Sequence, residues 1–202
     1  MAEQLATFLS TSPLGLVVLA VLVFGDAFFV ILPGEAAVTA FGALAVSTGS
    51  PPLILVISIS GMAAFAGDAC CYAVGRRVGL TRWRWMRRPR LQKAFALAHN
   101  RLQRSTGTVV FTARFIPFAR LAVNLTAGAT RTGAARYLTL ASLAALGWAA
   151  YQAVIGAIVA SLIPGGPFVA VLVSIAVALS IGFIIDALVA RRSPRAHSAR
   201  EG

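Results

Sequence analysis

The chain has 202 residues, of which 58% are hydrophobic and only 12% are charged, and its mean hydropathy is +0.83. This composition excludes a soluble globular domain and predicts an integral membrane protein with a single membrane domain, residues 1–190. The formal net charge of +12 comes from basic residues that flank apolar segments, which disfavours nucleic-acid binding and is typical of cytoplasmic loops of membrane proteins.

The first interrupted apolar region is residues 28–48, which contain Pro33, Gly34 and Glu35 in sequence. Proline disrupts a helix, and an ionised carboxyl inside a bilayer costs roughly 2.5–3.5 kcal/mol on insertion scales. We therefore expect residues 28–48 to enter the membrane and turn back, with Glu35 near the midplane. Residues 14–31 either span the membrane or form an arm that enters from outside.

A complete span is predicted at residues 52–75, which are long enough to cross about 30 Å of hydrocarbon and contain Gly67 and Asp68. The linker that follows, residues 76–105, holds ten of the eighteen Lys and Arg residues and is therefore expected to be cytoplasmic. Its tryptophans among arginines favour a segment at the membrane surface over a solvated loop.

The segment 107–130 has Arg114 and Arg120 on either side of Pro117. It leaves the cytoplasmic linker and returns to Arg131, which is also expected on the cytoplasmic side. An odd number of crossings would contradict both assignments, so we expect the segment to turn back near Pro117. Two arms of about ten residues would each reach about 15 Å, close to the midplane.

Two further spans are predicted, residues 137–161 and 168–190, before a basic cytoplasmic tail, residues 191–202. The segments 28–48 and 107–130 resemble each other faintly, and each precedes a long apolar helix. Entry from opposite sides predicts an inverted repeat. The expected fold is an all-α membrane protein with two inverted-repeat units, each a re-entrant hairpin followed by a transmembrane helix, plus a C-terminal transmembrane helix.

Taken together, the charged motifs resemble those of the DedA family, the bacterial branch of the SNARE-associated Golgi, or VTT-domain, membrane proteins. The resemblance covers roughly residues 24–160 and depends on the order and spacing of its motifs. These motifs are Asp26 nine residues before Glu35, Gly67-Asp68-x-x-x-Tyr72-x-x-Gly75-Arg76, Arg114-Phe115-x-Pro117-x-x-Arg120, and Ala127-Gly128 with Gly147 and Trp148 later.

The resemblance implies a lipid translocase or scramblase of the bacterial cytoplasmic membrane. Bacterial relatives are associated with moving undecaprenyl phosphate or phosphatidylethanolamine, with links to the proton-motive force. By this resemblance Arg114 and Arg120 are paired substrate-binding arginines, and Glu35 is the essential acid of the first re-entrant element. Asp68 matches the family's Gly-Asp, and Asp26 matches an acid that in relatives is often Glu. Structural roles are expected for Pro33, Gly34, Gly67, Pro117 and Gly128.

The chemistry of these residues is consistent with a phosphate-bearing ligand. A guanidinium stays charged in an apolar site, and its fork of donors matches phosphate oxygens. Burial raises the pKa of a carboxyl, whereas nearby arginines lower it. We expect Glu35 to bind substrate and couple its movement to protons, with Asp26 and Asp68 as the next candidates. Alternatively, the four charges at Glu35, Asp68, Arg114 and Arg120 are buried ion pairs that brace two hairpins.

We expect neither an enzyme nor a cofactor or metal site. The sequence lacks His-Glu-x-x-His and Gly-x-Ser-x-Gly. Two other classes stay open: a non-transporting membrane assembly or homeostasis factor and, less favoured, an intramembrane enzyme that acts on lipid phosphates. The expected partners are membrane lipids and protons. The identity of the lipid, its direction of movement and homo-oligomerisation are left open.

Overall fold

The computed structural model of the chain describes residues 11–29, 33–80, 84–114 and 116–162, together with residue 8 and four isolated positions after residue 168. These residues form helices and turns, with no strand among them, so the all-α fold class is confirmed over this part of the chain. The predicted span 168–190, apart from the four isolated positions, and the predicted tail 191–202 lie outside the described residues.

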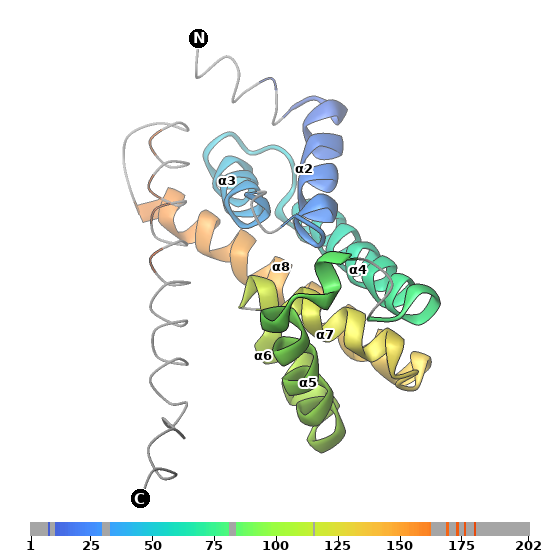
Figure 1. Cartoon of the computed structure of the whole chain (residues 1–202). Helices are drawn as coiled ribbons and strands as arrows, with labels where there is room; N and C mark the ends of the chain where they lie inside the picture. Colours follow the sequence, from blue (N-terminus) through green and yellow to red (C-terminus); the bar gives the residue numbers. More distant parts are fainter. Residues whose placement is uncertain are drawn as a thin grey trace, which may run out of the picture.

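In chain order the elements are α2 (Pro13–Asp26), α3 (Gly34–Ser47), α4 (Leu53–Val78), the 3-10 turn η1 (Arg84–Arg87), α5 (Pro89–Arg104), α6 (Thr106–Ala113), α7 (Pro117–Ala129) and α8 (Ala134–Leu162) (Figure 1). Two of them, α4 with 26 residues and α8 with 29, are long and apolar enough to cross a membrane. At 1.5 Å per residue they reach about 39 and 44 Å, against about 30 Å of hydrocarbon.

The first pair of short helices, α2 and α3, has 14 residues in each helix. Each reaches only about 21 Å, less than the hydrocarbon thickness of a bilayer. α2 begins after Ser12, whose hydroxyl accepts a hydrogen bond from the Leu14 amide at 3.2 Å, and it ends at Asp26. A continuous helical span over residues 14–31 is therefore excluded. α3 begins at Gly34, directly after Pro33, where the sequence predicts the break.

The second pair of short helices occupies the segment predicted to turn near Pro117. α6 has 8 residues and α7 has 13, and residues 114–116 separate them. Pro117 is in the first turn of α7, where its missing amide hydrogen leaves no hydrogen bond unmade. Arg114 is the residue that ends α6, so the interruption places it at the junction of the two helices.

The two halves of the chain, α2–α4 and α6–α8, pack reciprocally: one short helix of each half packs against the long helix of the other half. α3 packs against α8, and the two backbones approach closely at glycines. A methyl group at Gly156 would overlap the carbonyl oxygen of Thr39, and one at Gly42 would overlap the carbonyl oxygen of Ala153. Only a residue without a side chain is compatible with such contacts.

The reciprocal contact, α7 on α4, has the same construction. A methyl group at Gly75 would overlap the carbonyl oxygen of Leu125, and one at Gly128 would overlap that of Tyr72. In both contacts, therefore, one glycine of the short helix and one of the long helix allow the two backbones to touch.

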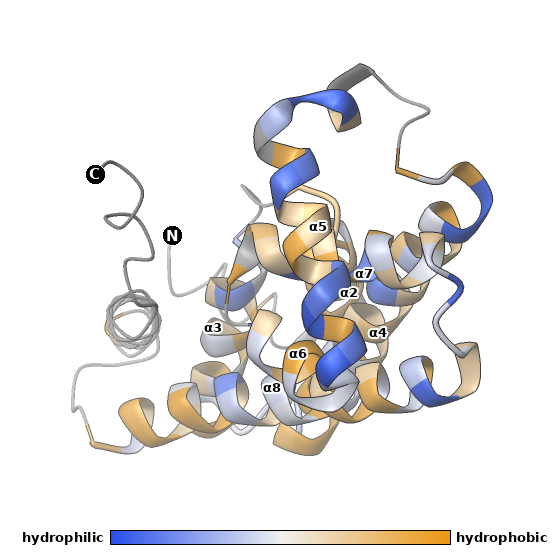
Figure 2. Cartoon of the chain, turned by 60° about the horizontal axis from the view of Figure 1, so that its bottom comes forward, coloured by the Kyte–Doolittle hydropathy of each residue, from blue (hydrophilic) through white to orange (hydrophobic). Residues whose placement is uncertain are grey.

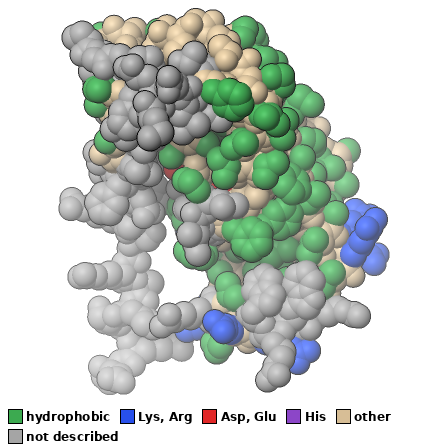
Figure 3. Space-filling model, turned by 90° about the horizontal axis from the view of Figure 1, so that it is seen from above, with side chains coloured by type: hydrophobic (Ala, Val, Ile, Leu, Met, Phe, Trp, Pro, Cys, Tyr) green, Lys and Arg blue, Asp and Glu red, His purple; other side chains and the backbone are tan. Residues whose placement is uncertain are grey.

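The long helices α4 and α8 also pack on each other, and the ring of Tyr72 stacks on Tyr137 with 5.0 Å between centroids. Their outer faces carry large exposed apolar side chains, among them Ile54, Met62 and Leu162, each more than 70% exposed. Figure 3 shows hydrophobic side chains over much of one face, with Lys and Arg at its margins. Such a surface suits contact with lipid.

The basic linker contains a helix, α5, that packs on α7. Its Phe95, Ala98 and Leu102 are buried, whereas Lys93 and Arg101 are exposed. Residues 89–104 are therefore not a solvated loop. In Figure 2 the C-terminal end of α8 is largely hydrophobic, and most strongly hydrophilic residues lie away from it.

Candidate functional site

Four charged side chains predicted to form the site meet inside the molecule, brought there by four different helices or helix ends. Asp26 ends α2, Asp68 lies within α4, Arg114 ends α6, and Arg120 is in the first turn of α7. Asp68 and both arginines are buried, and Asp26 is half-buried. α2 packs on α4, and α6 packs on α7 and α8, which brings Asp26 to Arg120 and Arg114 to Asp68.

The deeper ion pair joins Arg114 to Asp68. The Nη1 atom of Arg114 donates directly to Oδ2 of Asp68, and the two side chains are only 3% and 2% exposed. The other carboxylate oxygen, Oδ1, accepts a hydrogen bond from Nδ2 of Asn124 at 2.8 Å. The hydroxyl of Tyr137 in turn donates to Oδ1 of Asn124. Asp68 is therefore held by a cation and by a neutral donor that is itself held in place.

The outer ion pair joins Arg120 to Asp26. Nη2 of Arg120 donates to Oδ2 of Asp26 at 2.8 Å, and the side chains are 9% and 13% exposed. Nε of Arg120 also lies 3.8 Å from Oδ1 of Asp68. Arg120 is thus placed between both acids. Among the described residues no second donor that would fix its carboxylate reaches Asp26.

The guanidinium of Arg114 has unused hydrogen-bonding capacity. Its Nε and Nη2 atoms are buried and have no hydrogen-bond partner among the described residues. These two atoms form the side-on edge of the guanidinium, which can hold two oxygens of one anion. The indole ring of Trp148 lies 5.4 Å from the guanidinium carbon, so a cation–π contact covers another side of the group.

Glu35 lies in the first turn of α3 and is half-buried. Within the described part of the chain no ion pair joins it to an arginine. A carboxylate in the first turn of a helix is favoured by the helix dipole. Glu35 therefore belongs to the rim of the site rather than to its ion pairs.

Two of the predicted structural glycines make room for the end of α2. A methyl group at Gly34 would lie 2.9 Å from Cβ of Asp26, and one at Gly67 would lie 3.0 Å from the carbonyl oxygen of Phe24. Contacts this short require the glycine or a displacement of α2. Gly34 and Gly67 therefore determine where Asp26 sits relative to Arg120.

Sequence reasoning missed Asn124 and Tyr137 as members of the site. Asn124 follows Arg120 by four residues on α7, a spacing that puts both on one helix face. The sequence signal that could have identified Asn124 is a single amide side chain in an Ala- and Leu-rich helix. Tyr137 carries no comparable signal, because a tyrosine near the end of a membrane helix is ordinary.

Chemically, the site is equipped to exchange anions. Asp26, Glu35 and Asp68 supply one more negative charge than Arg114 and Arg120 neutralise when all five are ionised. Among the described residues no cluster of three His, Cys, Asp or Glu side chains is placed to hold a metal ion. An incoming anion adds to this excess of negative charge unless a carboxylate gives way or takes up a proton.

A family model described as the VTT domain matches residues 32–158 of the chain. The matched stretch includes Glu35, Asp68, Arg114 and Arg120, whereas Asp26 lies before it. The chain matches no curated protein and no solved structure.

Proposed function

Since the chain belongs to the VTT-domain family of membrane proteins, we propose that it moves a phosphate-bearing lipid between the leaflets of a bacterial cytoplasmic membrane. The lipid is chemically unchanged, and its candidates are undecaprenyl phosphate and a phospholipid such as phosphatidylethanolamine. The two halves of the chain supply the acids and the arginines of one shared site, which binds the headgroup.

The observation that carries the proposal is the free edge of Arg114. A buried donor without a partner typically costs about 1–3 kcal/mol, and more when it is charged. Here two such donors of one guanidinium lie side by side in a cluster that contains a second arginine. A phosphate group supplies oxygens for both donors and for Arg120, so its binding would remove the cost.

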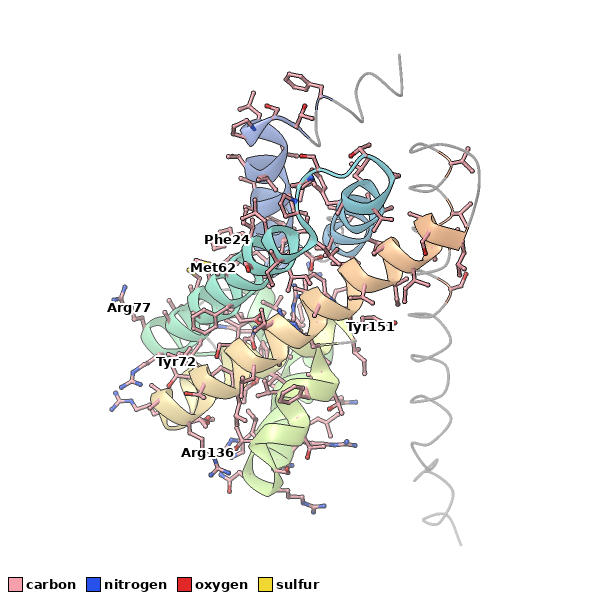
Figure 4. All side chains as sticks on the ribbon, turned by 180° about the vertical axis from the view of Figure 1, so that it is seen from behind. Phe24, Met62, Tyr72, Arg77, Arg136 and Tyr151 are labelled. Carbon is pink, nitrogen blue, oxygen red and sulfur yellow. The ribbon has the colours of Figure 1, made fainter. Side chains whose placement is uncertain are left out.

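The architecture supports a headgroup path through the membrane. We assign α2–α3 and α6–α7 as re-entrant hairpins, because none of their helices is long enough to cross, and α4 and α8 as spans. The reciprocal packing of α3 on α8 and α7 on α4 supports an inverted repeat. Arg77 and Arg136 lie toward the same end of the molecule (Figure 4), which supports a cytoplasmic location for that end.

The orientation has a simple test. Thr106→Cys and Thr132→Cys, in a background in which Cys70 and Cys71 are replaced, should be labelled by a membrane-impermeant maleimide from the same side. Labelling from opposite sides would exclude the hairpin assignment for α6–α7 and the inverted repeat with it.

The charge count makes proton uptake part of the proposal. A phosphate monoester brings roughly another −1.5 to −2 charge near neutral pH, into a site that already has an excess of carboxylates. When the phosphate engages Arg120, Asp26 loses its cation, and both Asp26 and Glu35 then face an anion. Protonation of a rim carboxyl lowers this repulsion. Movement of the lipid would therefore be coupled to protons.

The decisive experiment uses purified protein in phosphatidylcholine vesicles containing acyl-labelled fluorescent phosphatidate, phosphatidylethanolamine or diacylglycerol. A membrane-impermeant reductant that quenches only the outer leaflet reports movement between leaflets. Protein should accelerate loss of the phosphate-bearing labels but not of diacylglycerol. Arg114→Lys and Arg120→Lys should abolish the acceleration while the protein stays folded, because an ammonium lacks the fork.

Three results would contradict the proposal. If wild-type protein accelerates no label, the chain does not move these lipids, and an assembly role is favoured. If both lysine variants retain full activity, charge pairing rather than bidentate phosphate binding explains the arginines. Release of inorganic phosphate from the labelled phosphatidate would indicate an enzyme.

A further inference from the structure

The two ion pairs of the site differ in what holds their carboxylates. Asp68 is bound on both oxygens, by Arg114 on one side and by Asn124 on the other. Asp26 is bound on Oδ2 by Arg120. The pair on Asp68 is also the more deeply buried of the two. The difference arises from two neutral residues, Asn124 and Tyr137.

Tyr137 determines which way the amide of Asn124 points. A carboxylate accepts hydrogen bonds but donates none, so Asn124 must present its NH₂ group to Asp68. The amide oxygen then accepts a hydrogen bond from the Tyr137 hydroxyl. Tyr137 is fully buried and Asn124 is 4% exposed, so water offers little substitute for either bond. The tyrosine thus selects the orientation in which the amide can hold Asp68.

The hydrogen bond from Asn124 also competes with the second arginine for Asp68. It takes one of the two acceptor positions of Oδ1, the oxygen whose ion pair with Nε of Arg120 is long, at 3.8 Å. Without that donor, Oδ1 is left with Arg120 as a charged donor a small movement away. Asp68 would then hydrogen-bond to both arginines and compete with an incoming phosphate for them.

We infer that Asn124, held by Tyr137, is a positioning residue that confines Asp68 to Arg114 and leaves Arg120 with Asp26 as its exchangeable partner. The inference rests on the proposed function, because the competing ligand is a lipid phosphate. Phosphate then competes for Arg120 with Asp26, which is held less firmly than Asp68. The inference predicts that loss of Asn124 or of the Tyr137 hydroxyl weakens phosphate binding.

The test uses the full chain in detergent, with Trp83→Phe and Trp85→Phe, so that Trp148 is the one tryptophan left. Trp148 lies against Arg114, so its fluorescence should report occupancy. Farnesyl monophosphate is titrated, with farnesol as the neutral control. We expect the half-saturation concentration to rise about tenfold in Asn124→Leu and about threefold in Tyr137→Phe, since the lost bond serves a charged group.

A double variant and a matched control separate positioning from general stability. Because Tyr137 acts through Asn124, adding Tyr137→Phe to Asn124→Leu should raise the half-saturation concentration no further. Tyr72→Phe also removes one tyrosine hydroxyl, which donates to the carbonyl of Thr132 at 2.7 Å, and its ring stacks on Tyr137. It should lower the Tm without changing the half-saturation concentration.

The inference is overturned if folded Tyr137→Phe or Asn124→Leu binds farnesyl monophosphate as well as wild type or better. It is also overturned if the double variant raises the half-saturation concentration by the product of the two single effects, or if wild type shows no binding. Tyr137→Phe keeps its ring and provides the test should Asn124→Leu not fold. If binding shifts as expected but vesicles show no lipid movement, only the proposed function fails.

Discussion

The two halves of the molecule carry opposite charges into their common site. Helices α2–α4 supply Asp26, Glu35 and Asp68, and the chain has no Lys or Arg before Arg76. Helices α6–α8 supply Arg114 and Arg120, and the chain has no Asp or Glu between Asp68 and Asp186. Neither half can neutralise its own buried charges, so each depends on the other to place ionised groups in an apolar environment. The ion pairs are therefore one of the contacts that join the halves.

The largest effect expected from this comparison follows from removing Asp68, the acid that pairs with the more deeply buried arginine. Asp68→Ala leaves Arg114 buried without a counter-charge and should lower the free energy of unfolding by roughly 3–5 kcal/mol. Asp26→Ala breaks the same kind of contact at the more accessible pair and should cost about 1–2 kcal/mol, between exposed and buried pairs. Chemical unfolding in detergent measures both.

The double variant Asp68→Ala/Arg114→Leu is the control for that prediction. It removes the orphaned charge and should recover part of the lost stability. Equal losses of unfolding free energy for Asp68→Ala and Asp26→Ala would mean that the two ion pairs are equivalent. The distinction between Asp68 as a fixed acid and Asp26 as an exchangeable one would then be wrong.

A smaller effect is expected where the halves touch through backbone rather than charge. Gly156→Ala places a methyl group against the carbonyl of Thr39 and should destabilise the protein by about 1–3 kcal/mol, the usual cost of overpacking. Gly147→Ala, on the same helix, has nothing within 4 Å of the added methyl, so it should be neutral or slightly stabilising. If both variants have the same Tm, close approach of α3 and α8 does not hold the halves together.

Much of this arrangement was predictable from the sequence, for physical reasons. An ionised residue in an apolar stretch is conspicuous because it is costly, so Glu35, Asp68, Arg114 and Arg120 were found without a structure. Breaks at Pro33 and Pro117 were equally visible, because proline lacks a backbone donor. The start of α2 has a signal that sequence reasoning did not use, Ser12 before Pro13. Its end was not predictable, since an apolar run of Val and Leu has no period that marks where a helix ends.

Which acid meets which arginine was also beyond the sequence. Asp26 and Arg120 are 94 residues apart, and Asp68 and Arg114 are 46 apart; their pairing depends on how the helix ends converge. The sequence left open an ion pair between Glu35 and an arginine, whereas the ion pairs in the described residues use Asp26 and Asp68. Asn124 and Tyr137 escaped notice because a neutral polar residue in a membrane helix costs far less than a charge.

The smallest effect on stability, and the sharpest on function, is expected for Glu35. It has no arginine to release among the described residues, so Glu35→Gln should change the free energy of unfolding by less than about 0.5 kcal/mol. The proposed proton uptake, however, needs a carboxyl at the rim beside the bound phosphate. Glutamine imitates the protonated acid and cannot release a proton. The variant should therefore bind farnesyl monophosphate yet move labelled phosphatidate at a rate independent of a pH gradient, whereas the wild-type rate responds to the gradient. Identical responses in Glu35→Gln and wild type would assign proton uptake to Asp26, the other half-buried carboxyl. Asp26→Asn would then be the variant whose transport rate no longer responds to the pH gradient.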